Sequence, residues 1–431
     1  MTDLIIRQAR VIDSKRDDIA DVAIKNGKIS EIAPSIAENV VPEIDAEGLV
    51  LMPGGIDPHV HFNEPGRTDW EGLETGSRAL AKGGITSFFD MPLNSSPTTT
   101  TAKAYHDKRR LADEKSLLNA YLWGGLTPDN LEHLGDLLDC GVIGFKAFMS
   151  NSGIDEFPAI DDDSLYRGMQ FLAPHGAIVA VHAESDTITS DLAQKAIQAG
   201  KVSARDYLDS RPIRAEIEAI ERAITLAEET GCKLHIVHVS SARGVELVTE
   251  AQQRGIDVTC ETCPHYLVLI DTDLETIGAA AKCAPPIRSS VEQEKLWEQL
   301  LAGHIPIIAS DHSPAPMNLK QGDNFFDIWG GIAGCQSTLP LLLTEGYHRR
   351  GMSLQQIVAI TSTNTAKRFG LKNKGAIDIG MDADLTLVDT DADYTLEASD
   401  LAYKHPISPY IGMPLIGKIE KTFVGGKRVY G

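Results

Sequence analysis

The chain has 431 residues, and its 40 Lys and Arg against 61 Asp and Glu give a formal net charge of -21. With 42% hydrophobic and 23% charged residues, the composition is that of a globular protein with a large core, which excludes a disordered chain, a collagen-like fibre and a coiled-coil rod. The acidic excess and the scattered basic residues argue against a nucleic-acid partner. No apolar run is long enough for a membrane span and the start lacks a signal-peptide pattern, so we expect a cytoplasmic protein without a membrane partner.

The first 48 residues contain short strand-like runs, LIIRQARVID, DVAIKNGKISEIA and VVPEIDAEG. Their Asn26-Gly27 pair is typical of a hairpin turn. The tail from about residue 375 has the same character, with DADLTLVD and IGKIEKTFVGGKRVYG. Because a small sheet is only marginally stable alone, we expect residues 1–50 and 372–431 to form one discontinuous β-sandwich domain.

Between these ends, eight β-rich runs alternate with segments of helical periodicity. The runs cover residues 49–61, 85–92, 119–126, 141–149, 177–184, 233–240, 257–267 and 306–314. A helix is predicted over residues 213–230, where Ile217, Ile220, Ile224 and Ala227 form one apolar face and Gly231 supplies the stop.

Eight strands, each followed by a helix, predict an α/β protein whose residues 51–371 form a (β/α)₈ barrel. The alternative is a doubly wound open sheet. No GxGxxG turn follows the first strand, which disfavours that alternative.

Six cysteines occur, at positions 140, 232, 260, 263, 283 and 335. In a long chain without a secretion signal, reduced thiols are expected rather than a disulfide framework. Cys260 and Cys263 have CxxC spacing, but no second CxxC completes a structural zinc site. A redox or metal role for this pair is therefore the weaker interpretation.

The most informative short motif is His59-Val60-His61, at the end of the first run. Side chains two apart in a strand share a face, so both imidazoles can bind one metal ion. Catalytic groups of such barrels lie at the C-terminal ends of the strands. Potential ligands recur there at Lys146, His182, His238 and Asp311. A lone histidine is more often structural, but four histidines and an aspartate at strand ends favour a metal site.

Two of these positions require a choice between alternatives. On the sixth strand, His235 and His238 are three apart and face opposite sides, and His238 lies nearer the active end. Lys146 among metal ligands is costly as a cation. Its amine can react with CO2 to give a carbamate, a carboxylate-like ligand that bridges two metal ions. The alternative is a lysine that extends to solvent.

PGGIDPHVHFNEPGRTDWEG, GFKAFMSNSGIDEFP, ETCPHYL and ASDHSP together resemble the cyclic amidohydrolases, most closely their allantoinase branch, over the whole chain. The resemblance implies two divalent metal ions, with zinc as first choice and cobalt, manganese or nickel as alternatives. His59, His61 and Asp311 would bind one ion and His182 and His238 the other, with carboxylated Lys146 as the bridge. Asp311 would also carry a proton from water to the leaving ring nitrogen. A homotetramer is expected on the same basis.

The substrate is predicted from residues near these ligands. Dihydroorotases, which the chain also resembles, carry an arginine two positions after HxH to bind the substrate carboxylate, and Asn63 stands there instead. A neutral amide favours a neutral ring such as allantoin. Asn94 and Ser313 lie where members of the family contact substrate, although Asn94 could instead cap a turn and Ser313 a helix. Dihydropyrimidinase or hydantoinase activity, and a non-catalytic scaffold of the dihydropyrimidinase-like kind, remain alternatives.

Overall fold

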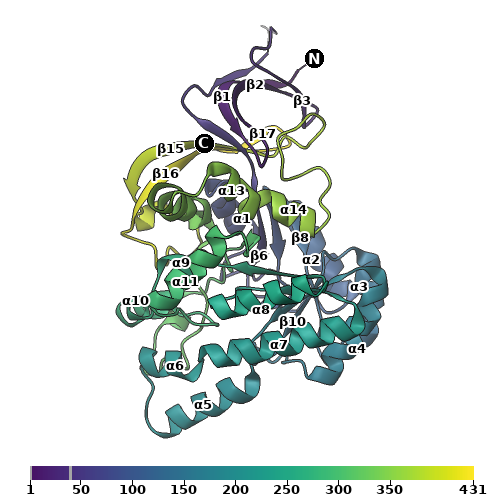
Figure 1. Cartoon of the computed structure of the whole chain (residues 1–431), viewed down its shortest axis with the longest axis vertical. Coiled ribbons are helices and arrows are strands. Elements are labelled where there is room, and N and C mark those ends of the chain that lie inside the picture. The colour runs from purple at the N-terminus through teal and green to yellow at the C-terminus, as the bar shows by residue number, and fades with distance from the viewer. Residues whose placement is uncertain (1, 38–40) are drawn as a thin grey trace.

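The computed structural model describes residues 2–37 and 41–431. It is an α/β protein in which strands from both chain ends lie together at one end of the molecule, with parallel strands and helices below them (Figure 1). The run predicted over residues 40–48 begins at residue 40, which lies outside the described residues.

Strands from both termini form one mixed eight-stranded sheet, the terminal sheet, in the order β17-β16-β15-β5-β1-β2-β3, with β4 beside β1. Their bounds are β1 Leu4–Ile12, β2 Asp17–Lys25, β3 Lys28–Ala33, β4 Glu43–Asp45, β5 Val50–Pro53, β15 Leu385–Thr395, β16 Pro414–Val424 and β17 Lys427–Tyr430. The β2–β3 hairpin turns at Asn26 and Gly27, both with positive φ (51° and 75°), as predicted.

The two chain ends share one apolar core. Ile6, Val22 and Leu51 from the N-terminal part and Leu385 and Phe423 from the tail belong to a single buried cluster. Because β15 pairs with β5, neither end completes this core alone. Strands from the two chain ends thus pair in one sheet, as the prediction of a shared domain requires.

Nine parallel strand segments form the centre of the molecule in two sheets. One sheet has the order β6-β7-β8, with β6 Gly55–Val60, β7 Ile85–Asp90 and β8 Asn119–Leu122. The other has the order β14-β13-β12-β11-β10-β9, with β9 Gly124–Gly125, β10 Phe145–Phe148, β11 Ile178–His182, β12 Lys233–Ile236, β13 Val258–Thr262 and β14 Ile307–Ile308. Segments β8 and β9 are separated only by Trp123, so each predicted run contributes parallel strand structure.

The prediction of one strand over residues 49–61 is wrong, because this stretch is divided at Gly54. Val50–Pro53 pairs with β1 and β15 in the terminal sheet, whereas Gly55–Val60 pairs with β7. A side chain at Gly54 would lie 2.2 Å from the methyl carbon of Thr86, so only glycine fits where the chain passes from one sheet to the other.

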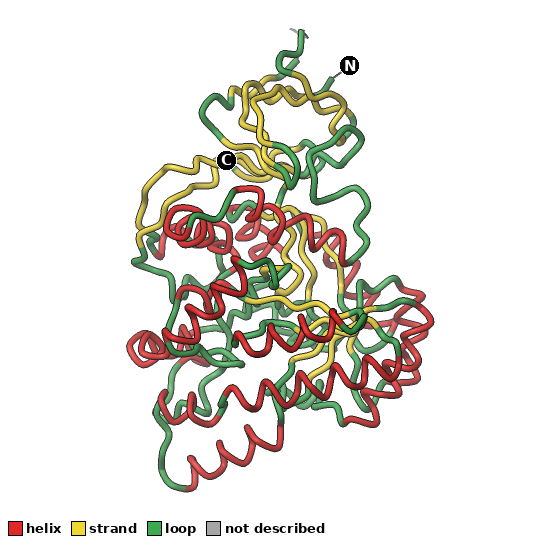
Figure 2. Tube along the Cα trace, in the orientation of Figure 1, coloured by secondary structure: helices red, strands yellow, loops and turns green. Residues whose placement is uncertain are grey.

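The helices lie around the parallel strands (Figure 2). Their bounds are α1 Leu73–Lys82, α2 Ala102–Lys115, α3 Leu134–Cys140, α4 Asp162–Leu172, α5 Asp186–Gln198, α6 Ala204–Ser210, α7 Ile213–Thr230, α8 Ala242–Gln253, α9 Pro264–Val268, α10 Asp271–Ile277, α11 Ser290–Leu301, α12 Thr338–Leu341, α13 Leu354–Val358 and α14 Asn364–Arg368.

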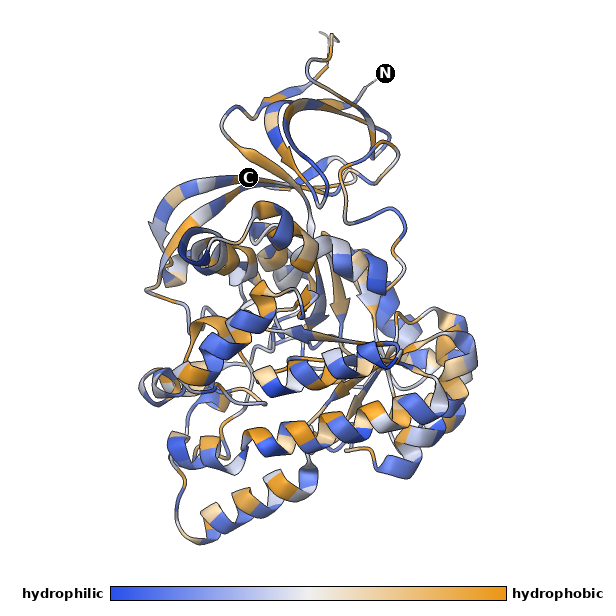
Figure 3. Cartoon of the chain, viewed as in Figure 1, coloured by the Kyte–Doolittle hydropathy of each residue, from blue (hydrophilic) through white to orange (hydrophobic). Residues whose placement is uncertain are grey.

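Helix α7 has the predicted bounds. Ile220, Ile224 and Ala227 are buried, and Gly231 ends the helix in the left-handed conformation (φ 69°). Figure 3 shows hydrophobic and hydrophilic residues alternating along this helix, as one buried and one exposed face require. All six cysteines are free thiols, also as predicted.

Candidate active site

Three of the predicted ligands converge in one cluster. His59 lies near the end of β6, His61 follows that strand, and Asp311 follows β14. The Asp311 carboxylate oxygen Oδ1 is 3.2 Å from His59 Nε2 and 3.4 Å from His61 Nε2. One potential ligand atom from each residue lies within 4.8 Å of the other two. These three residues can therefore hold a metal ion.

His182 and His238 form a second group beside the first. The His182 Nδ1 and His238 Nε2 atoms are 3.1 Å apart, and both side chains are buried. The ring centroids of His59 and His238 are 5.4 Å apart, so the two groups are neighbours. Burial lowers the pKa of His182 and that of His238, so both imidazoles are neutral and able to bind a cation.

Lys146 is on β10 and its side chain is fully buried. Its Nζ atom has no hydrogen-bond partner among the described residues and lies 4.6 Å from the centroid of the Phe148 ring. Burial lowers the pKa of Lys146 to about 7, although the negative charges of Glu261 and Asp311 oppose this shift. The interpretation of Lys146 as a lysine extending to solvent is thereby wrong.

Backbone strain is concentrated at this site. Apart from Gln8 and Asn26, the described non-glycine residues with positive φ are Asn63 (64°), Asn94 (67°), His238 (38°) and Asp311 (46°). Such a conformation costs on the order of 1–3 kcal/mol and persists where the surrounding structure enforces it. Four predicted site residues are therefore held in place by the fold at an energetic cost.

The position of His238 is set by the turn that follows strand β12 and not by alternation along the strand. Strand β12 ends at Ile236, and the chain then turns so that His238 lies beyond the strand. His235 points elsewhere, with its Nε2 atom 3.0 Å from Glu261 Oε2 and its Nδ1 atom 2.8 Å from Thr259 Oγ1. His238 lines the cavity and His235 does not, but the parity argument does not apply past the strand end.

Glu261 is a site residue that the sequence prediction missed. Its carboxylate binds His59 Nδ1 at 2.6 Å and His235 Nε2 at 3.0 Å. Burial opposes ionisation of Glu261, but these hydrogen bonds outweigh it and lower its pKa to about 2. A proton held on His59 Nδ1 leaves the Nε2 lone pair facing Asp311, as metal binding requires.

Glu184 orients His182 in the same way and was also missed. Its carboxylate lies 2.9 Å from His182 Nε2 and forms a buried ion pair with Arg211. Burial raises the pKa of Glu184, but Arg211 and His182 outweigh this and lower it to about 2. Both glutamates had a signal in the sequence. Glu184 stands two residues after His182, and Glu261 is the first residue of the motif ETCPHYL.

The four histidines and the aspartate predicted as ligands line one cavity of about 440 Å³. Asn94 and Ser313 also line it, with the Asn94 Nδ2 atom 3.5 Å from His61 Nδ1. Asn63 does not line the cavity, because its buried Nδ2 atom donates to the Pro314 carbonyl at 3.4 Å. Apolar rings and chains form one wall, contributed by Phe148, Tyr207, Phe326, Ile328 and Trp329. A ring of small-molecule size fits above the ligands.

Residues 50–429 match the model of the Amidohydrolase family. The chain belongs to the amidohydrolase family. The resemblance stated from the sequence is thus confirmed, and the protein is a hydrolase of cyclic amides from a metal-dependent family.

This amidohydrolase is similar to curated proteins over its full length. It is 52% identical to the allantoinase of Solibacter usitatus, an alignment that covers 100% of this chain and 94% of that protein. It is 51% identical to the allantoinase of Deinococcus radiodurans over 99% of this chain and 95% of that protein. Among solved structures, the L-hydantoinase (dihydropyrimidinase) of Arthrobacter aurescens matches with a TM-score of 0.97 and 36% identity, covering 100% of this chain and 96% of the other.

Within residues 2–37 and 41–431, no helix of the amidohydrolase is both long and apolar enough to span a membrane.

Proposed function

We propose that this amidohydrolase is an allantoinase, which hydrolyses the ring amide of allantoin to give allantoate. The observation that carries the proposal is the identity of 51–52% to allantoinases over at least 99% of the chain. The identity to the L-hydantoinase is lower, at 36%, although the fold is nearly the same. Because one fold serves several substrates, the sequence similarity is the stronger guide to the substrate.

The donor set fits two divalent metal ions. His59, His61 and Asp311 would hold one ion, and His182 and His238 the other. Two buried carboxylates, Glu261 and Glu184, orient His59 and His182, which is the arrangement common around metal-binding histidines. Zinc suits these ligands best, and cobalt, manganese or nickel are alternatives.

Lys146 is proposed to bridge the two ions as a carbamate formed with CO2. Its fully buried nitrogen has no hydrogen-bond partner among the described residues. A permanent ammonium there would lack hydrogen-bond acceptors for its three protons. Carboxylation replaces that unpaired donor with two oxygen atoms and a negative charge, which suits a position between two cations.

When bound, the metal ions would activate water and polarise the ring carbonyl. Asp311 is ionised, because burial is outweighed by His59 and His61, which hold the pKa of its carboxyl far below its usual range. The Asp311 carboxylate lines the cavity beside the histidines, and this position allows it to accept a proton from the attacking water and pass it to the leaving ring nitrogen. The cavity walls orient the ring, and no covalent bond to the protein is needed.

Substrate contacts are assigned to Asn94 and Ser313, which line the cavity beside the ligands. Asn63 lies outside the cavity and is proposed to affect it indirectly, because its side chain donates to the carbonyl of Pro314, the residue after Ser313. Its amide cannot balance a substrate carboxylate, so a neutral ring is favoured over dihydroorotate.

The two parallel sheets are proposed to close into a (β/α)₈ barrel over residues 51–371. Support comes from both gaps between them. The backbone N–H of Ile143, just before β10, donates to the carbonyl of Leu122 in β8 at 2.9 Å, and His61 N–H donates to the His312 carbonyl at 2.8 Å, joining β6 to the end of β14. The terminal sheet, with residues 1–50 and 372–431, is proposed to curl into a sandwich around its apolar cluster. The homotetramer stays a prediction of the resemblance, and the cytoplasmic location stays a prediction from the sequence pattern.

The test compares kcat/KM of metal-loaded protein for allantoin, hydantoin, dihydrouracil and dihydroorotate. We expect allantoin to be the best substrate and dihydroorotate the poorest. A higher kcat/KM for hydantoin or dihydrouracil would replace the proposal with hydantoinase or dihydropyrimidinase activity, which the structural similarity to the L-hydantoinase makes the second candidate. Absence of both turnover and bound metal would indicate the scaffold alternative.

A further inference from the structure

Two buried lysines lie beside the cavity and are not used by the proposed reaction. Lys282 and Lys320 are 4% and 7% exposed, and neither forms an ion pair with a described carboxylate. A buried ammonium normally has a carboxylate partner, because burial of an unpaired charge is costly. Burial lowers the pKa of Lys282 to about 7 and that of Lys320 to about 8.

Both lysines donate to backbone carbonyls of one segment instead. Lys282 Nζ binds the carbonyl oxygens of Phe325 (2.7 Å) and Ile328, with Phe326 at 3.4 Å. Lys320 Nζ binds those of Gly331 (2.5 Å) and Trp329 (3.1 Å), with Ala279 at 3.4 Å. Residues 325–331, which we name the wall segment, thus supply five of the six carbonyls. The protonated form of each lysine has three N–H donors for its three carbonyl acceptors.

The wall segment is also held by backbone hydrogen bonds, some to other parts of the chain and some to the same lysines and their neighbours. The Phe325 N–H donates to the Val202 carbonyl at 2.8 Å, and the Phe326 N–H donates to Asn324 Oδ1 at 3.0 Å. The Gly331 N–H donates to the Lys282 carbonyl at 2.7 Å, and the Trp329 N–H donates to Leu319 at 2.9 Å. The wall segment has no helix or strand to satisfy its carbonyl groups. The lysine amines take over that role, since buried carbonyls left without donors are unfavourable.

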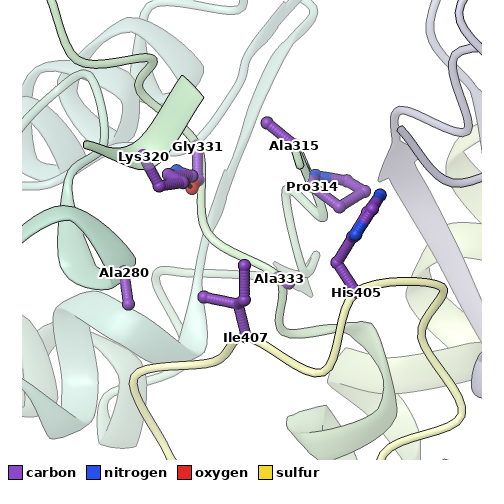
Figure 4. Close-up of a pocket in the computed structure, with 8 residues that line it drawn as sticks. All are labelled: Ala280, Pro314, Ala315, Lys320, Gly331, Ala333, His405 and Ile407. Carbon is purple, nitrogen blue, oxygen red and sulfur yellow. Dashed lines mark hydrogen bonds between the residues drawn. The ribbon is translucent and has the colours of Figure 1, made fainter. Parts of the chain in front are cut away.

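Water has little room to replace Lys320. Figure 4 shows this side chain against Gly331, at the edge of a small cavity that Pro314, Ala333 and His405 also line. The cavity holds about 10 Å³, which is the lower limit for a single water molecule. Removal of the amine would therefore leave the carbonyls of Trp329 and Gly331 without an equivalent donor.

The wall segment faces the catalytic cavity. Phe326, Ile328, Trp329 and Gly330 line it, and the Trp329 ring packs edge-on against Trp70, with 4.8 Å between centroids. The predicted ligands lie at or just beyond strand ends, and the wall segment adjoins them near Asp311, where the Ser313 N–H donates to the Ile332 carbonyl at 2.9 Å. Because its side chains line the cavity, the position of the wall segment determines the contacts made with a substituent that projects from the reacting ring.

We propose that Lys282 and Lys320 are positioning residues whose side-chain nitrogens fold residues 325–331 into the cavity wall that contacts the substituent of the substrate ring. That this substituent is a ureido group rests on the proposed function. Loosening the wall weakens substrate binding and leaves the ring amide, the ligands and Asp311 in place. The lysines thus affect KM and selectivity more than kcat.

The test uses the metal-loaded variants Lys282→Met and Lys320→Met, with Lys25→Met at the exposed end of β2 as the matched control. We expect KM for allantoin to rise about tenfold, equivalent to roughly 1.4 kcal/mol, with kcat changed by less than about threefold. KM for unsubstituted hydantoin should change less. Amide hydrogen exchange in residues 325–331 should accelerate, while metal content stays unchanged.

Wild-type exchange rates in residues 325–331, together with wild-type KM values in both variants, would overturn the inference. Lys320 lies outside the catalytic cavity, so Lys320→Met decides the question if Lys282→Met does not fold. If neither variant folds, unprotected amides in the wild-type segment would still contradict the inference. If wild-type protein does not hydrolyse allantoin, the proposed function is wrong. The hydrogen-exchange measurement does not depend on the substrate, so it still tests whether the lysines hold the wall segment in place.

Discussion

Glu261 links two histidines that have different roles. It holds His59 Nδ1 at 2.6 Å, so that the other ring nitrogen faces Asp311, and it fixes His235 outside the cavity. A carboxylate behind a metal-binding imidazole fixes its tautomer and raises its basicity. At this point the candidate metal site therefore includes both His59 and the carboxylate that orients it.

Glu261→Gln should lower metal affinity or turnover about 10–100-fold, because the amide keeps the shape of the side chain and removes its charge. Metal content after dialysis and kcat for allantoin are the measurements. Glu246→Gln, on the exposed face of α8, serves as the control and should match wild type. Unchanged metal retention in Glu261→Gln would contradict the role given to Glu261.

Lys146→Ala should lose bound metal and turnover, because it removes the proposed bridge. Added acetate or propionate should restore part of both, since a small carboxylic acid can occupy the space left by the carbamate. Lys201→Ala, an exposed substitution, should have no effect. Full metal content in Lys146→Ala would show that the lysine does not bridge.

The sequence predicted side chains that the structure brings together, but it did not predict the carboxylates that contact His59 and His182. His59 and His61 could be predicted because strand alternation is local, and Asp311 because strand ends share one face of the protein. The pairing of His59 with Glu261 joins residues 202 positions apart. It depends on how neighbouring strands are aligned, which no local pattern specifies.

At the scale of elements, the buried Lys282 predicts a pH effect on stability. Its pKa is lowered from 10.5 to about 7, by burial first and then by Arg211 and Lys320, while Asp327 opposes the shift. Tyr207 also faces it, with the ring centroid 4.7 Å from Nζ. Above pH 7 the unfolded chain binds more protons at this residue than the folded chain, so the free energy of unfolding rises with pH.

The unfolding free energy of wild type, relative to Lys282→Met, should therefore increase between pH 7 and pH 9, by at most about 1.4 kcal/mol per pH unit. Urea denaturation of metal-loaded protein at both pH values measures this difference. A difference that does not change with pH would show that Lys282 keeps its proton in the folded state.

The prediction of helices and strands succeeded where a local periodic pattern of apolar residues is sufficient to define the element. Helix α7 has the predicted bounds because its apolar face and Gly231 are local signals. The stretch 49–61 failed because both of its halves are apolar and extended, and only the partners of Val50–Pro53 assign that half to the terminal sheet. The alternation argument for His238 failed for a related reason, because strand β12 ends at Ile236, two residues before His238.

At the scale of the whole molecule, two buried threonines join the terminal sheet to the parallel strands. Thr386 Oγ1 donates to the Gly84 carbonyl and Thr422 Oγ1 to the Ala81 carbonyl, both at 2.7 Å. These bonds connect β15 and β16 to the end of α1. The terminal sheet thereby supports the element that precedes β7.

Thr386→Val and Thr422→Val should each lower the free energy of unfolding by about 1 kcal/mol, because valine keeps the shape and loses the hydrogen bond. Chemical denaturation provides the measurement. Thr276→Val removes a comparable bond on exposed α10 and should change stability by less than about 0.5 kcal/mol. Wild-type stability in both buried variants would contradict this coupling.

The central claim is that one site, made by six residues from five strand ends, hydrolyses allantoin with two metal ions. Titration of metal-free protein with zinc, with allantoin turnover as the readout, tests it most directly. We predict that turnover is absent without metal and reaches its plateau at two ions per chain. Full turnover without metal, or no turnover at any metal loading, would contradict the account.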